Sequence, residues 1–139
     1  MIQRQQTLWL LLSTISAILS FLFPFVSGKE VLKTNLLADK VVDAGSDLYL
    51  LVLTGASLIL STIIIFLFKN RKQQMQLCLI GILLSVLIIF LYIRQMNRLV
   101  KPILALSCII TLFILIGYFM ALRNIRKDEK LVKSLDKLR

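Results

Sequence analysis

The sequence contains no histidine and only two cysteines among its 139 residues. Without histidine the chain cannot build a Ser/His/Asp or Cys/His catalytic arrangement, and a metal site would lack its commonest ligand. A Walker-type glycine loop, a Gly-x-Ser-x-Gly motif and paired carboxylates on a rigid element are also missing. We therefore expect a protein that is not an enzyme and that has no catalytic, metal-binding or cofactor-binding residue.

Charge is absent from four long stretches, at residues 5–28, 48–68, 73–93 and 102–122. About 20 apolar residues in a helix rise about 30 Å, the thickness of the hydrocarbon layer of a membrane. A chain that is 58% hydrophobic could not hide so much apolar surface from water in a soluble domain of this size. We predict an all-α membrane protein, a single domain in which four transmembrane helices form an antiparallel bundle. The predicted spans cover about residues 6–26, 48–68, 74–93 and 102–122, and a cytoplasmic tail covers 123–139.

Basic residues are distributed unevenly between the loops. One lies before the first span, three lie at 69–72 and seven in the tail, whereas three lie at 27–47 and three at 94–101. Cytoplasmic loops carry an excess of Lys and Arg, so the division of eleven against six predicts that both termini are cytoplasmic. The basic residues at 94–101 then face outward, and we interpret them as solvated loop charges.

The first span resembles a secretory signal at its end, because small residues at 27–28 follow the apolar run. The run is longer than the roughly 7 to 15 residues of such a signal, and Pro24 lies among phenylalanines where a cleavable region is small and polar. We expect the span to be retained. Pro24 removes a backbone donor and crowds the carbonyl group of Ser20, so the helix should end or kink there.

Aromatic residues gather near the ends of the spans, where aromatic side chains commonly anchor helices at the membrane surface. We interpret them as two interfacial belts rather than as a ligand cage. The outer belt would contain Phe21, Phe23, Phe25, Tyr49 and Tyr92, and the inner belt Trp9 and Tyr118.

Each span carries small or weakly polar residues at helical spacing. Lipid is as apolar as leucine, so helices associate in it by packing, and small residues let their backbones approach closely. We interpret these residues as helix contacts rather than as the lining of a solute path, which would need stronger polar groups. The predicted contacts are Ser13, Ser16 and Ser20 on the first span, Thr54, Ser57 and Ser61 on the second, Cys78, Gly81 and Ser85 on the third, and Ser107, Thr111, Gly117 and Ala121 on the fourth.

The two cysteines, Cys78 and Cys108, lie in different predicted spans. Antiparallel helices would separate them by roughly 13 Å in depth, beyond the limit of about 7 Å between the Cα atoms of a disulfide. We expect both thiols to be reduced and structural.

The loop at 27–47 is the only sizeable external segment. Its apolar pairs Val31-Leu32, Leu36-Leu37 and Val41-Val42 recur every five residues, a period that fits neither a clean strand nor a clean helix. A short interfacial helix and an irregular cap over the bundle both remain open. In either case we expect a connector that rests on the lipid boundary.

The tail has the pattern of a basic amphipathic helix, and no proline or glycine separates it from the fourth span. It could lie on anionic lipid at the cytoplasmic face, where each basic residue contributes about 1 kcal/mol, or dock to a protein. Nucleic acid is not expected, because no aromatic residues accompany the charge. The candidate binding residues are Leu131, Leu135 and Leu138 on the apolar face and Lys130, Lys133 and Lys137 on the polar face.

Three polar segments of the chain resemble one protein family. They are residues 1–12 (MIQRQQTLWLLL), 69–78 (KNRKQQMQLC) and 127–139 (KDEKLVKSLDKLR). Together they resemble the small four-span proteins of Bacteroidota catalogued as domain of unknown function 4293, and the likeness covers the whole chain in order. The resemblance implies the inner membrane of a Gram-negative bacterium, and it brings no established activity, substrate or catalytic residue.

By exclusion, we expect a non-enzymatic inner-membrane protein that serves as an accessory or scaffold subunit of a larger membrane assembly. The alternative is a small transporter or channel component that acts as an oligomer. A scaffold should co-purify with other membrane proteins, whereas a pore should form a homo-oligomer with its small-residue faces around a wet axis. A membrane enzyme would require a partner that brings the catalytic groups.

Overall fold

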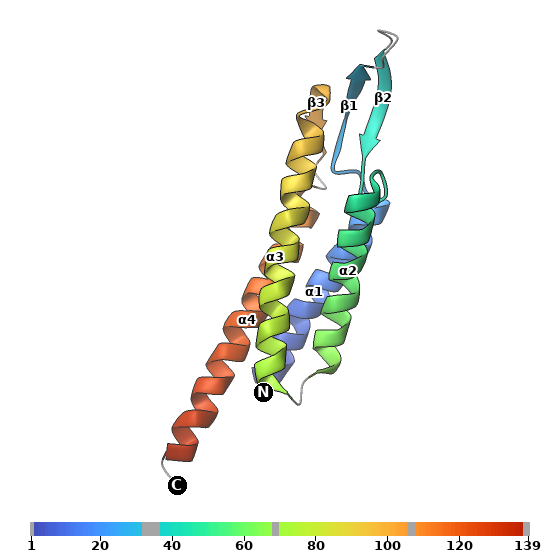
Figure 1. Ribbon diagram of the computed structural model, residues 1–139. Helices are drawn as coiled ribbons and strands as arrows, with labels where there is room; N and C mark the ends of the chain where they lie inside the picture. The colour runs from blue at the N-terminus through green and yellow to red at the C-terminus, as the bar shows by residue number, and fades with distance from the viewer. Residues whose placement is uncertain (1, 32–36, 68–69, 106–107, 138–139) are drawn as a thin grey trace.

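The computed structural model describes residues 2–31, 37–67, 70–105 and 108–137 (Figure 1). This part of the chain contains four long helices and three short strands. In chain order the elements are α1 (Ile2–Leu22), β1 (Val26–Val31), β2 (Leu37–Val42), α2 (Leu48–Phe66), α3 (Arg71–Met96), β3 (Val100–Leu104) and α4 (Cys108–Lys137).

All four helices are long and apolar enough to cross a membrane, which confirms the prediction of a multi-pass membrane protein with four spans. Each helix packs against two others, in the cycle α1, α2, α3, α4 and back to α1. Consecutive helices run in opposite directions in Figure 1, and the two ends of the chain lie at the same end of the molecule. Many leucine, isoleucine and phenylalanine side chains face outward, as lipid-facing side chains do.

Two helix boundaries differ from the predicted spans. Helix α1 ends at Leu22 instead of residue 26, shortly before Pro24, as the loss of a backbone donor predicts. The carbonyl group of Ser20 accepts a hydrogen bond from the Ala44 amide at 3.2 Å, a partner from outside its own helix. Helix α4 begins at Cys108 instead of residue 102, because Pro102 lies in the edge strand β3, where a missing donor is tolerated.

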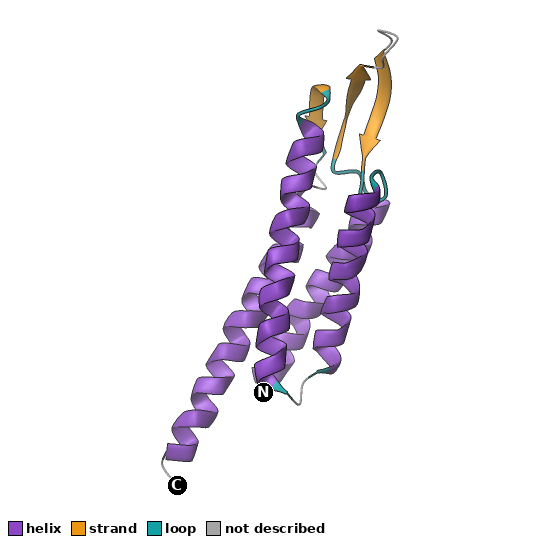
Figure 2. Cartoon of the chain, in the orientation of Figure 1, coloured by secondary structure: helices purple, strands orange, loops and turns teal. Residues whose placement is uncertain are grey.

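The described residues of the segment at 27–47 form a β-hairpin, which corrects both the interfacial helix and the irregular cap expected from the sequence. Strands β1 and β2 pair antiparallel with Val26 opposite Val42, and β3 pairs with the other side of β1, giving the order β2-β1-β3. The membrane-spanning part is therefore all-helical, while the chain as a whole is not. Figure 2 shows the strands gathered at the end opposite the chain termini.

A small apolar core joins the sheet to the helices. Val26 and Val42 are buried in it, and Phe25 stacks on Tyr92 of α3 with ring centroids 4.3 Å apart. Gly28 lies where β1 is irregular, and a Cβ atom there would be 3.1 Å from the Cβ of Leu99. Tyr92 is thus buried under the sheet, which corrects its assignment to an interfacial belt.

Helices α1 and α4 approach each other closely at Gly117. A Cβ atom added to Gly117 would lie 2.8 Å from the Cβ of Ser13 and 2.8 Å from the carbonyl oxygen of Trp9. Side chains in the main core surround this contact, among them Leu10 and Ala17 of α1. The missing side chain of Gly117 therefore lets the backbones of the first and last helices approach each other.

Gly117→Ala should lower the stability of the protein, whereas Gly55→Ala should not. Nothing lies within 4 Å of a Cβ atom at Gly55, so this helical glycine is a matched control. Overpacking costs about 1 to 3 kcal/mol, while alanine in a helix is favoured over glycine by up to about 1 kcal/mol. Thermal unfolding in mild detergent, followed by circular dichroism, measures both variants. Equal losses for the two would contradict the close α1–α4 contact.

Candidate functional site

The predicted helix-contact residues face the interior of the bundle. Every described member of the set is buried, while Ser107 lies outside the described residues. The buried members are Ser13, Ser16 and Ser20 in α1, Thr54, Ser57 and Ser61 in α2, Cys78, Gly81 and Ser85 in α3, and Thr111, Gly117 and Ala121 in α4.

Several of the buried hydroxyl groups bond to the backbone of their own helix. Ser20, Ser57 and Ser85 each donate to the carbonyl oxygen three residues earlier, at 2.8 to 2.9 Å. A hydroxyl group satisfied in this way has little need of water, which suits a dry interface between helices. Within the described part of the chain, the buried Oγ1 of Thr54 has no hydrogen-bond partner.

Tyr118 lies in the centre of the bundle and not in the inner interfacial belt expected from the sequence. Its ring packs on Gly81, where an added Cβ atom would meet ring carbons at 2.5 and 2.6 Å. Its hydroxyl group donates a hydrogen bond of 2.6 Å to the carbonyl oxygen of Ser57. The side chain thus joins three helices, and burial is possible because the polar tip has an acceptor.

A polar cluster closes the end of the bundle that carries both termini. The Gln6 side chain of α1 donates to the Asp128 carboxylate of α4, and both are buried. The guanidinium group of Arg71 donates to the Asp128 carbonyl oxygen at 3.5 Å, and the Gln74 amide donates to the Ile64 carbonyl oxygen at 3.3 Å. These contacts join residues far apart in the chain, so the sequence pattern did not indicate them.

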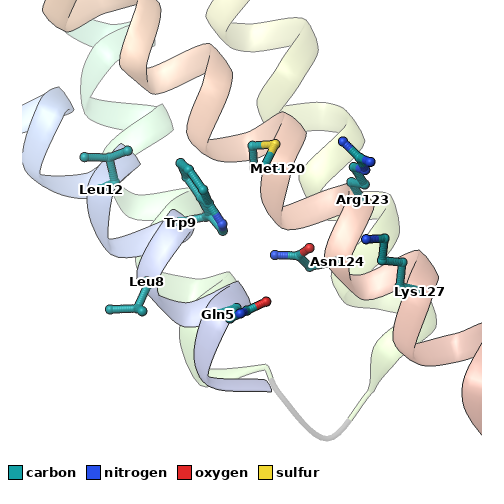
Figure 3. Close-up of a pocket in the computed structure, with 8 residues that line it drawn as sticks. All are labelled: Gln5, Leu8, Trp9, Leu12, Met120, Arg123, Asn124 and Lys127. Carbon is teal, nitrogen blue, oxygen red and sulfur yellow. The ribbon is translucent and has the colours of Figure 1, made fainter. Parts of the chain in front are cut away.

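An open groove between α1 and α4 lies beside this cluster (Figure 3). Its volume is about 670 Å³, within the range of about 300 to 1,000 Å³ that is usual for ligand pockets. Apolar and basic side chains both line the groove. The sequence pattern did not indicate that these side chains lie together. The lining residues are Gln5, Leu8, Trp9 and Leu12 from α1 and Met120, Arg123, Asn124 and Lys127 from α4.

The tail continues α4 as one helix to Lys137, as the absence of a helix breaker predicted. Lys130 and Leu131 are exposed. Lys133, Leu135 and Lys137 lie in the helix, and nothing further can be said of their side chains, while Leu138 lies outside the described residues. In Figure 1 the end of α4 projects beyond the other helices.

The two cysteines do not form a disulfide. Cys78 is buried within α3, and Cys108 is half-buried at the start of α4. Among the described residues, no group of three His, Cys, Asp or Glu side chains could hold a metal ion.

Gly81→Ala should destabilise the native protein more than it destabilises a Tyr118→Leu variant. The added methyl group overlaps the tyrosine ring, and a leucine leaves room for it. Thermal unfolding of both single variants and the double variant in detergent gives the coupling free energy, which we expect to be about 1 kcal/mol or more. The same cost of Gly81→Ala in both backgrounds would contradict the ring contact.

No curated protein and no solved structure matches the chain. Residues 2–138, nearly the whole length, match the family described as Domain of unknown function (DUF4293). The chain, with its four helices long and apolar enough to cross a membrane, therefore belongs to this family.

Proposed function

We propose that this protein is a non-enzymatic accessory or scaffold subunit of a larger assembly in the bacterial inner membrane, with both termini in the cytoplasm. The observation that carries the proposal is the continuation of α4 beyond the bundle. Asp128 is the last described buried residue of α4, and the helix runs on to Lys137, a rise of about 14 Å.

The direction of the tail favours docking to a protein over adsorption to lipid. An amphipathic helix that binds the membrane surface lies in the plane of the interface. Here the tail prolongs a membrane-crossing helix without a break and leads away from the other helices (Figure 1). Leu131 is 49% exposed on it, so the helix offers an apolar anchor of the kind that a protein groove accepts.

The packing of the bundle gives less support to the transporter or channel alternative. The small-residue faces are buried between helices of one chain, and Tyr118 fills the space over Gly81. These faces are therefore not available to surround a shared axis between several copies.

Deletion of residues 130–139 should leave folding intact and remove the co-purifying proteins. Affinity purification in mild detergent with mass spectrometry compares the deleted protein with the full chain. Leu131→Ser with Leu135→Ser should have the same effect, since a protein groove depends on apolar anchors. Lys130→Gln with Lys133→Gln is the matched control that keeps these anchors. A partner list that survives both the deletion and the leucine substitutions would refute docking through the tail.

The proposed orientation predicts the reaction of introduced cysteines with an impermeant thiol reagent in intact cells. In a Cys78→Ala/Cys108→Ala background, Asp39→Cys should react, because this exposed position lies in β2 at the outer end. Gln73→Cys, at an exposed position near the opposite end, should react only after the cells are lysed. The reverse pattern would place both termini outside.

A further inference from the structure

The groove between α1 and α4 changes from apolar to basic along its length. Met120 precedes Arg123 by one turn of α4, and Lys127 follows Arg123 by another. Arg123 is the first charged residue after the uncharged stretch at 102–122. The groove therefore crosses the level at which the hydrocarbon layer gives way to lipid headgroups.

The basic end of the groove suits an anion. Arg123 and Lys127 line it together with Gln5 and Asn124, and none of the eight lining residues is acidic. The nearest acid along α4, Asp128, accepts a hydrogen bond from Gln6. Arginine and lysine side chains are the usual partners of phosphate groups, arginine through its planar fork and lysine as a point charge.

Asn124 adds a neutral donor to the basic end. The residue is only 7% exposed and lines the groove. In Figure 3 its amide group points into the space between α1 and α4, toward Gln5. An amide N–H group in this position could donate to a phosphate oxygen.

The other end of the groove suits an acyl chain. Leu12 of α1 and Met120 of α4 line this end, and Leu8, which is 65% exposed, lies one turn nearer the basic end of the groove (Figure 3). Trp9 lies between the two ends, a position typical of an indole ring at the membrane surface. A free anion would use only the basic end, whereas a phospholipid would fill both.

We propose that the groove binds one anionic phospholipid, with its phosphate group held by Arg123, Lys127 and Asn124. An acyl chain lies along Leu8, Leu12 and Met120. This site is distinct from the exposed lysines of the tail, and it holds a single lipid in a defined place.

Trp9 supplies the test, because it is the only tryptophan in the chain and it lines the groove. The full-length protein in mild detergent is titrated with phosphatidylglycerol that carries brominated acyl chains, and the quenching of tryptophan fluorescence is measured. Brominated phosphatidylcholine and inorganic phosphate form the other arms. We expect saturable quenching by phosphatidylglycerol, half-complete at a concentration about tenfold lower than for phosphatidylcholine. Inorganic phosphate should not displace the lipid.

Substitutions in the groove should weaken this binding. Arg123→Gln with Lys127→Gln should raise the half-quenching concentration of phosphatidylglycerol about tenfold or more, and Asn124→Asp should raise it by repelling the phosphate group. Arg126→Gln with Lys130→Gln removes the same charge from exposed positions of α4 outside the groove, and should change little. Circular dichroism shows that each variant keeps its helices.

Four results would overturn the proposal. The first is equal quenching by the two lipids, and the second is an equal loss of affinity in the groove variants and the exposed control, which would indicate attraction by net charge alone. The third is a Trp9 fluorescence that brominated lipid does not change, which would show that something other than lipid occupies the groove. Displacement of the lipid by inorganic phosphate would assign the basic end to a free anion instead.

Discussion

The contact between α1 and α4 connects the features that distinguish this molecule. At its centre Gly117 faces the backbone of α1 at Trp9 and Ser13, and the Ser13 hydroxyl group donates to the carbonyl oxygen of Ile114 at 3.4 Å. Pairing of β1 with β3 continues the contact outward, because β1 follows α1 and β3 precedes α4. The Gln6 bond to Asp128 continues it at the other end. The first and last helices thereby close the ring of four.

The interior of the ring follows from the lack of water in the hydrocarbon layer, where each polar group needs a partner within the protein. Ser20 and Ser57 bond within their own helices, and the hydroxyl group of Tyr118 donates to the carbonyl oxygen of Ser57. Among the described residues, no three metal-ligating side chains come together. The groove and the tail lie toward the end of the bundle that carries both termini.

Several local features could be predicted because they depend on neighbouring residues in the chain. Pro24 ends α1 through its own missing donor, and the uninterrupted helix from Cys108 to Lys137 follows from the absence of a breaker. The aromatic residues show the opposite case. Tyr92 and Tyr118 are close to the ends of uncharged stretches and were assigned to the membrane surface, yet both are buried, because Phe25 and Gly81 from other elements meet them.

The hairpin, like the buried tyrosines, depends on contacts between residues that are distant in the chain. Its apolar pairs recur every five residues, and the irregularity at Gly28 interrupts the alternation of side chains that is typical of a strand. Only the pairing of β1 with β2 and β3 shows that these segments form a sheet. The groove likewise requires Trp9 and Asn124 to face each other across two helices that are distant in the chain. The amino-acid sequence alone was sufficient to predict the four spans and the family. A charged side chain is costly in lipid, so each span could be recognised from its own uncharged stretch. Only the tertiary structure could decide the sheet, the buried tyrosines and the groove, because these depend on which distant residues come into contact.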